Sequence, residues 1–107
     1  MLPLDRGIVV SGYTNHVDSN KDAKSNVFAV FTQDPAGDEK ARLLVRRRQQ
    51  GTGVWTDVYT FHADDATKYG YCSVECVLKN LVILASERQP DGTNPVREYI
   101  LVDVCEI

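Results

Sequence analysis

Residues 71–88 have the sequence YCSVECVLKNLVILASER, and whether they form one helix or two strands decides the fold class. Their apolar residues fall at helical spacing, which favours a helix over residues 73–88. The same stretch is rich in valine, isoleucine and tyrosine, which favour strands, and Lys79-Asn80 could form a turn between two of them. We therefore predict two strands, Tyr71 to Leu78 and Leu81 to Glu87, and keep the helix as the alternative.

The runs on either side of this stretch also predict strands. They are Gly7 to Thr14, Asn26 to Gln33, Ala41 to Arg48, Val54 to His62 and Val96 to Val104. Segments rich in proline, glycine, asparagine and aspartate separate them and are typical of turns. The polar segment from Asp18 to Asp22 is expected to be a loop. The sequence thus predicts an all-β fold, an antiparallel sandwich or barrel of six to seven strands, with α+β as the alternative if residues 73–88 are helical.

Length and composition restrict the class of protein. A chain of 107 residues is expected to form a single domain, residues 1–107. Its net charge of -3 argues against a nucleic-acid partner, and no apolar run is long enough for a membrane helix. The start lacks the residue order of a secretory signal, and an odd number of cysteines (three) fits a reducing compartment. We therefore expect a cytoplasmic or other intracellular protein.

Arg46-Arg47-Arg48 is the one basic run in the chain. Successive residues of a strand point to opposite faces, so Arg46 and Arg48 should share a face and Arg47 should lie on the other. Arginines divided in this way make a poor track for phosphates, and the run is interpreted as a solvated strand end.

Four residues of the run from Val54 to His62 are candidates for binding a ligand. Trp55, Tyr59 and Phe61 alternate along the predicted strand, which would place them on one face together with Asp57. Aromatic rings stack on the apolar faces of sugars and other small molecules, and a carboxylate accepts hydrogen bonds from their hydroxyl groups. The alternative is that these aromatic residues form part of the core.

A repeated motif suggests a possible metal site. Tyr13-Thr14-Asn15-His16-Val17-Asp18 and Tyr59-Thr60-Phe61-His62-Ala63-Asp64 share the pattern Tyr-Thr-x-His-x-Asp. If the two segments lie side by side, His16, His62, Asp18 and Asp64 could bind zinc, iron or manganese. Polar residues in such corners are more often solvated, so we expect no cofactor.

Three functions follow from these features, in order of preference. The first is a non-catalytic, self-associating binding module that takes a small-molecule or carbohydrate ligand on the aromatic face. The second is a structural assembly subunit, such as a virion or phage protein. The third is a metal-dependent enzyme that uses His16 and His62.

Overall fold

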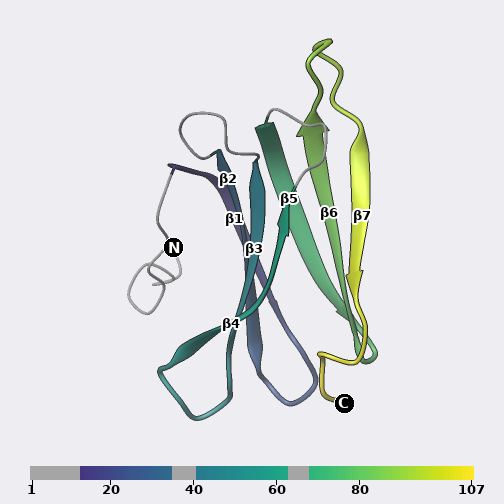
Figure 1. Ribbon diagram of the computed structural model, residues 1–107. Helices are drawn as coiled ribbons and strands as arrows, with labels where there is room; N and C mark the ends of the chain where they lie inside the picture. The colour runs from purple at the N-terminus through teal and green to yellow at the C-terminus, as the bar shows by residue number, and fades with distance from the viewer. Residues whose placement is uncertain (1–12, 35–40, 63–67) are drawn as a thin grey trace.

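The structure is a computed structural model that describes residues 13–34, 41–62 and 68–107. Every regular element among these residues is a β-strand, which confirms the predicted all-β fold (Figure 1). The strands are β1 (Tyr13–Lys21), β2 (Val27–Asp34), β3 (Arg42–Arg48), β4 (Trp55–His62), β5 (Lys68–Val77), β6 (Asn80–Arg88) and β7 (Val96–Leu101).

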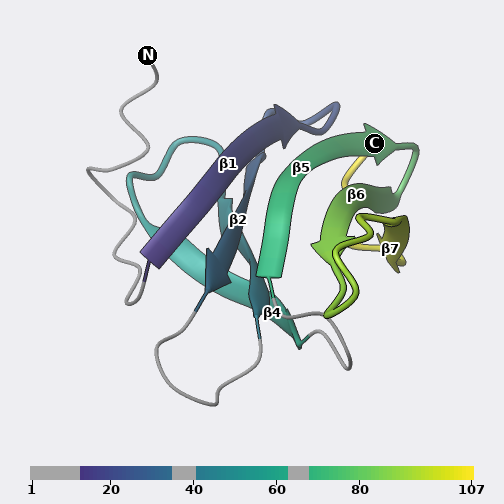
Figure 2. The ribbon, with the colours of Figure 1, turned by 90° about the horizontal axis from the view of Figure 1, so that it is seen from above.

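The strands form two antiparallel sheets that pack as a β-sandwich. One sheet has the order β1-β2-β3-β4 and the other β5-β6-β7, so each sheet pairs strands that are neighbours in sequence. Seen from above, β1 of the first sheet runs beside β5 of the second (Figure 2). Hydrogen bonds join the sheets here: Asp18 Oδ2 accepts one from the Val74 amide at 2.9 Å, and Cys72 Sγ donates one to the Val30 carbonyl at 3.7 Å.

The core lies between the two sheets and follows from the period of two along each strand. Its buried side chains include Phe28, Val30, Leu43, Val45, Tyr69, Cys72, Val74, Leu81, Ile83, Ala85 and Tyr99. A smaller apolar cluster lies on the outer face of the four-stranded sheet, where Ala29 and Phe31 pack with Val17, Leu44 and Trp55. Burial of apolar area at about 25 cal/mol per Å² is the main force that holds the sheets together.

The stretch 71–88 forms a hairpin, so the helical alternative is wrong. Val77 of β5 pairs with Asn80 of β6, which leaves Leu78 and Lys79 as the turn, one residue earlier than predicted. Leu78 has a φ of 54°, in the left-handed region of backbone conformation that residues other than glycine rarely occupy. The helical spacing was misleading because apolar residues lie on both faces of β6.

The polar residues of segment 18–22 predicted a loop, and this prediction is wrong. β1 continues through it to Lys21, which pairs with Val27 of β2. The carboxylate of Asp18 is half-buried against β5, where it accepts the Val74 amide, so this strand does not need an apolar residue there. Residues 7–12 of the predicted first strand lie outside the described residues.

The last strand ends earlier than predicted, and residues 102–107 form a separate C-terminal segment. β7 stops at Leu101, and the following residues turn away from the sheet (Figure 1). The Cys105 amide donates to the Lys79 carbonyl at 2.9 Å, and the Ala23 amide donates to the Glu106 carbonyl at 3.2 Å. The segment therefore connects the β5–β6 turn to the loop between β1 and β2.

Candidate binding site

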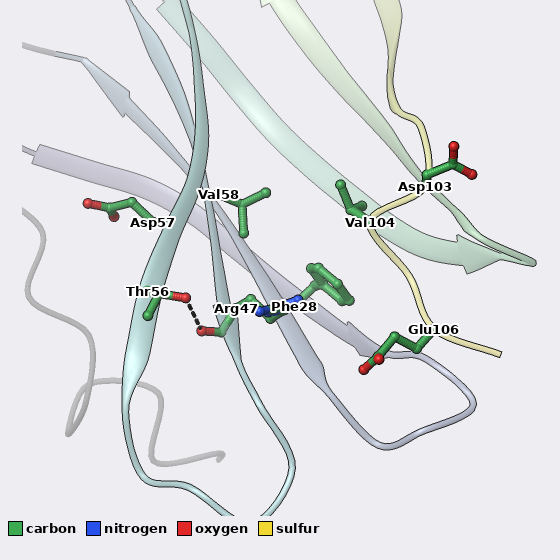
Figure 3. A pocket seen from close by; sticks show the side chains of 8 residues that line it. All are labelled: Phe28, Arg47, Thr56, Asp57, Val58, Asp103, Val104 and Glu106. Atoms are coloured by element: carbon green, nitrogen blue, oxygen red, sulfur yellow. Dashed lines mark hydrogen bonds between the residues drawn. The ribbon is translucent and has the colours of Figure 1, made fainter.

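A cleft of about 460 Å³ opens between the four-stranded sheet and the C-terminal segment (Figure 3). It is lined by Phe28, Arg47, Thr56, Asp57, Val58, Asp103, Val104 and Glu106. Phe28, Arg47 and Thr56 lie directly opposite one another on β2, β3 and β4. Phe28 is fully buried and Val58 and Val104 partly so, which gives the cleft an apolar lining with charged groups around it.

Arg47 differs from the two arginines beside it. Arg46 Nε lies 2.7 Å from Asp57 Oδ1, and the Arg48 guanidinium lies over the Trp55 ring at 5.5 Å. The half-buried Arg47 side chain extends beside Phe28, and within the described part of the chain no hydrogen bond or ion pair engages its guanidinium (Figure 3). The predicted alternation is confirmed, since Arg46 and Arg48 lie on the outer face and Arg47 on the inner one.

The wall of the cleft formed by the C-terminal segment is held by a group of residues that we call the clasp: Asp22, Asn26 and Glu106. Asp22 Oδ2 accepts hydrogen bonds from the Glu106 amide and from Asn26 Nδ2, both at 2.9 Å, and Asp22 Oδ1 accepts the Asn26 amide at 3.0 Å. Asn26 Nδ2 also donates to the Glu106 carboxylate, and Asn26 Oδ1 accepts the Gln50 amide at 3.0 Å. The clasp thus ties the β1–β2 loop, the β3–β4 loop and the C-terminal segment together.

The hydrogen bonds of the clasp also determine the charge state of the Asp22 carboxylate. Burial alone would raise the pKa of Asp22, but the hydrogen bonds from the backbone of Glu106 and from Asn26 and Lys24 outweigh burial and lower it. Asp22 is therefore ionised at neutral pH, and its charge is distributed over several N–H donors rather than over water.

A β-bulge divides the predicted aromatic face, so the prediction that its four residues share a face is wrong. Arg46 pairs with Asp57 and Val45 with Tyr59, which leaves Val58 as an extra residue in β4. Before the bulge, Trp55 packs on the outer cluster and Asp57 points away from the cleft (Figure 3). After the bulge, Phe61 packs against the core between the sheets. An extra residue reverses the alternation of a strand, and no feature of the sequence indicated it.

The aromatic residues beyond the bulge pack against one another and are only partly exposed to solvent. The ring of Phe61 lies 4.6 Å from Tyr99 and 4.7 Å from Tyr59, which is itself 52% exposed. The hydroxyl of Tyr99 is hydrogen-bonded to the hydroxyl of Tyr69 at 2.9 Å and donates to the buried carboxylate of Glu87. Burial raises the pKa of both Tyr69 and Tyr99 above the usual tyrosine value.

The sheet order does not bring the two histidine-bearing strands together. His16 is on β1 and His62 on β4, at opposite edges of the four-stranded sheet, with β2 and β3 between them. Three strand spacings separate their backbones by about 14 Å. Asp18 binds the Val74 amide, His62 is exposed, and Asp64 and the His16 side chain lie outside the described residues. Residues 13–34, 41–62 and 68–107 contain no group of three or more potential metal ligands.

The cysteines are free thiols held in apolar surroundings. Burial raises the pKa of Cys72 and of Cys76 to about 12, and the charge of Asp18 adds to the effect at Cys72. Cys76 of β5 and Cys105 of the C-terminal segment lie close enough for each thiol to influence the pKa of the other. Thiols of such high pKa are poor nucleophiles at neutral pH.

Sequence reasoning missed the residues that form the cleft. It identified Asp57, whose carboxylate is turned away, and interpreted Arg47 as part of a solvated strand end. The available signal was the alternation of the arginine run, which predicted that Arg47 alone faces inward. The contribution of Val104 and Glu106 could not be predicted, because it depends on where the chain turns after β7.

The chain matches no protein-family model, and searches of curated proteins and of solved structures find nothing significantly similar to it. None of the described residues belongs to a helix that could cross a membrane.

Proposed function

We propose that this domain is a non-catalytic binding module whose ligand site is the cleft at Arg47. The observation that carries the proposal is the guanidinium of Arg47, which no described residue engages, in a cleft with apolar side chains. A partly buried cation loses hydration, and a bound anion can replace that hydration with two parallel hydrogen bonds. The ligand class that fits is a small carboxylate with an apolar body.

The other residues of the cleft suit such a ligand. Phe28, Val58 and Val104 offer apolar surface next to the arginine, and a cleft of about 460 Å³ is within the range of small-molecule sites. The clasp fixes one wall without using the guanidinium, so the site is preformed and binding need not order it. Glu106 and Asp103 on that wall would disfavour ligands with more than one negative charge.

A flat aromatic platform for a sugar has less support. Trp55 is partly buried beneath Arg48, and Phe61 packs against Tyr99, so neither ring is fully presented to solvent. Carbohydrate binding on a single face needs the rings on the same side of the sheet, and the bulge at Val58 separates them.

Titration with phenylacetate, followed by backbone NMR, tests the proposal. We expect shifts at Arg47, Thr56 and Val104, and weaker effects from phenylethanol and phenethylamine, which have no carboxylate. Arg47→Gln should weaken phenylacetate binding by roughly tenfold or more, equivalent to about 1.4 kcal/mol or more for the lost charge-assisted hydrogen bonds.

Arg46→Gln is the matched control, since it removes the same charge one residue away on the other face. Equal loss in both variants, or no shift at the cleft with millimolar phenylacetate, would rule out the proposed site. The metal-enzyme hypothesis on His16 and His62 is tested separately, by elemental analysis of protein purified without an affinity tag.

A further inference from the structure

The outer face of the three-stranded sheet presents apolar and acidic side chains to solvent. Its cross-strand rows are Ser73–Leu84–Glu98 and Glu75–Val82–Ile100, with Val96 opposite Ser86 in the next row. Leu84 is 43% exposed, Ile100 47% and Val96 59%. We call Val82, Leu84, Val96 and Ile100, with Glu75 and Glu98, the acidic-apolar face; Lys68 and Arg88 lie opposite each other at the far end of this sheet.

The outer face of the four-stranded sheet has the opposite charge. Lys21, Val27, Arg48 and Trp55 form one cross-strand row, and Arg46 lies in the next row beside Asp57. Beneath these cations lies the outer apolar cluster of Phe31 and its neighbours. We call Lys21, Arg46, Arg48 and Trp55 the basic face.

We propose that copies of this chain stack head to tail, with the acidic-apolar face of one copy on the basic face of the next. The two faces belong to different sheets and both point away from the core, so one molecule can use both at once. Pairing two acidic-apolar faces would bring glutamates together, whereas the head-to-tail contact places Glu75 and Glu98 near Arg46 and Arg48. The inference is independent of the ligand cleft.

A contact of this type can continue from one copy of the chain to the next. Two different surfaces make a heterologous interface, which produces a ring if the rotation closes and a filament if it does not. The area limits its strength: three strands about 4.8 Å apart and six residues long cover about 15 by 20 Å. A standard interface buries about 800 Å² on each partner, so we expect weak association in the micromolar range or above that salt reduces.

Sedimentation velocity of the full chain, from micromolar to millimolar concentration and at low and high salt, tests the proposal. We expect species larger than a dimer at low salt and high concentration. Leu84→Lys blocks the acidic-apolar face and Arg48→Glu blocks the basic face, so each variant alone should remain monomeric. An equimolar mixture of the two should form a dimer and nothing larger, because only one functional pair of faces remains.

Two comparisons keep the outcome decisive. Lys24→Glu makes the same change of charge as Arg48→Glu at an exposed loop position outside both faces, and it should assemble like the unchanged protein. Near-ultraviolet circular dichroism verifies that each variant is folded. A monomer under all conditions, or assembly retained by either blocked variant alone, would overturn the proposal; retention by Arg48→Glu would indicate a symmetric contact between acidic-apolar faces.

Discussion

Asp22 is the buried carboxylate on which the position of the C-terminal segment depends. It accepts amide hydrogen bonds from Lys24, Asn26 and Glu106, and each replaces a bond to water. Buried N–H groups left without an acceptor are costly, so one side chain determines whether several donors are satisfied. The residue thereby links a local turn to the wall of the cleft.

Asp22→Asn tests this role at the scale of one residue. It keeps the size but directs an NH₂ group toward N–H donors, and we expect a loss of about 2–4 kcal/mol in unfolding free energy at neutral pH. Because the pKa of Asp22 is lowered in the folded state, its stabilisation is present above the usual value of 3.8 and is lost as pH falls below it. Urea unfolding of both proteins should therefore differ most at neutral pH and least near pH 3.

Asp103→Asn provides the comparison, since Asp103 is exposed and its amide, not its carboxylate, is the group bonded to Asn80. A similar stability loss in both variants would show that the effect is one of net charge and not of the clasp.

Bulges in β4 and β5 determine the shape of the two sheets at the element scale. In β5 the register shifts between Tyr69 and Cys72, and the strand passes close to β6 at Gly70. A Cβ added to Gly70 would lie 2.3 Å from Ser86 Oγ, which accepts the Tyr71 amide at 3.0 Å. Only glycine fits there without displacing a buried hydroxyl.

Gly70→Ala should therefore destabilise the protein by about 1–3 kcal/mol through this overlap. In the background of Ser86→Ala the hydroxyl is absent, and the same change should cost clearly less; thermal unfolding of the four proteins forms a double-mutant cycle that measures the difference. Gly53→Ala, where the added Cβ meets nothing within 4 Å, is the control. Additive effects at positions 70 and 86 would contradict this explanation of the bulge.

The sequence predicted elements well where one face is consistently apolar. The strands at Ala29 and at Leu44 were placed within a residue or two, because alternation and turn residues agreed there. The hairpin at Leu78 was found with its turn shifted by one position. β1 was misplaced because the polar side chain of Asp18 is satisfied by a strand of the other sheet, a partner that local patterns do not reveal. The bulge at Val58 had no local signal, so the candidate face was wrong even though its strand was right.

At the scale of the whole molecule, several buried groups bind protons more tightly in the folded state. Burial raises the pKa of Tyr69 and Tyr99, and it raises the pKa of Cys72 and Cys76 to about 12. In the unfolded chain these groups lose their protons near pH 9 to 10. Stability from this source is therefore complete below about pH 9 and falls as pH rises toward 12.

We expect the melting temperature to fall steeply above about pH 9, and the tyrosine absorbance change of two of the five tyrosines to coincide with unfolding. Tyr69→Phe removes one titrating group and should make the alkaline decline of stability shallower. A decline of equal slope in that variant would assign the effect to other residues.

The bond from the Glu106 amide to Asp22 joins positions 84 residues apart, whereas each sheet pairs strands that follow one another along the chain. Once the sandwich has folded, ordering residues 102–107 still costs about 1–2 kcal/mol of backbone conformational entropy per residue, and few long-range hydrogen bonds offset that cost. We expect this ordering to be the last event of folding and its reversal the first step of opening. Native-state hydrogen exchange should then show the Cys105 and Glu106 amides exchanging with a free energy below that of the amides of β6, and insensitive to low denaturant. The wall of the cleft formed by the C-terminal segment would in that case open transiently while the sandwich stays folded.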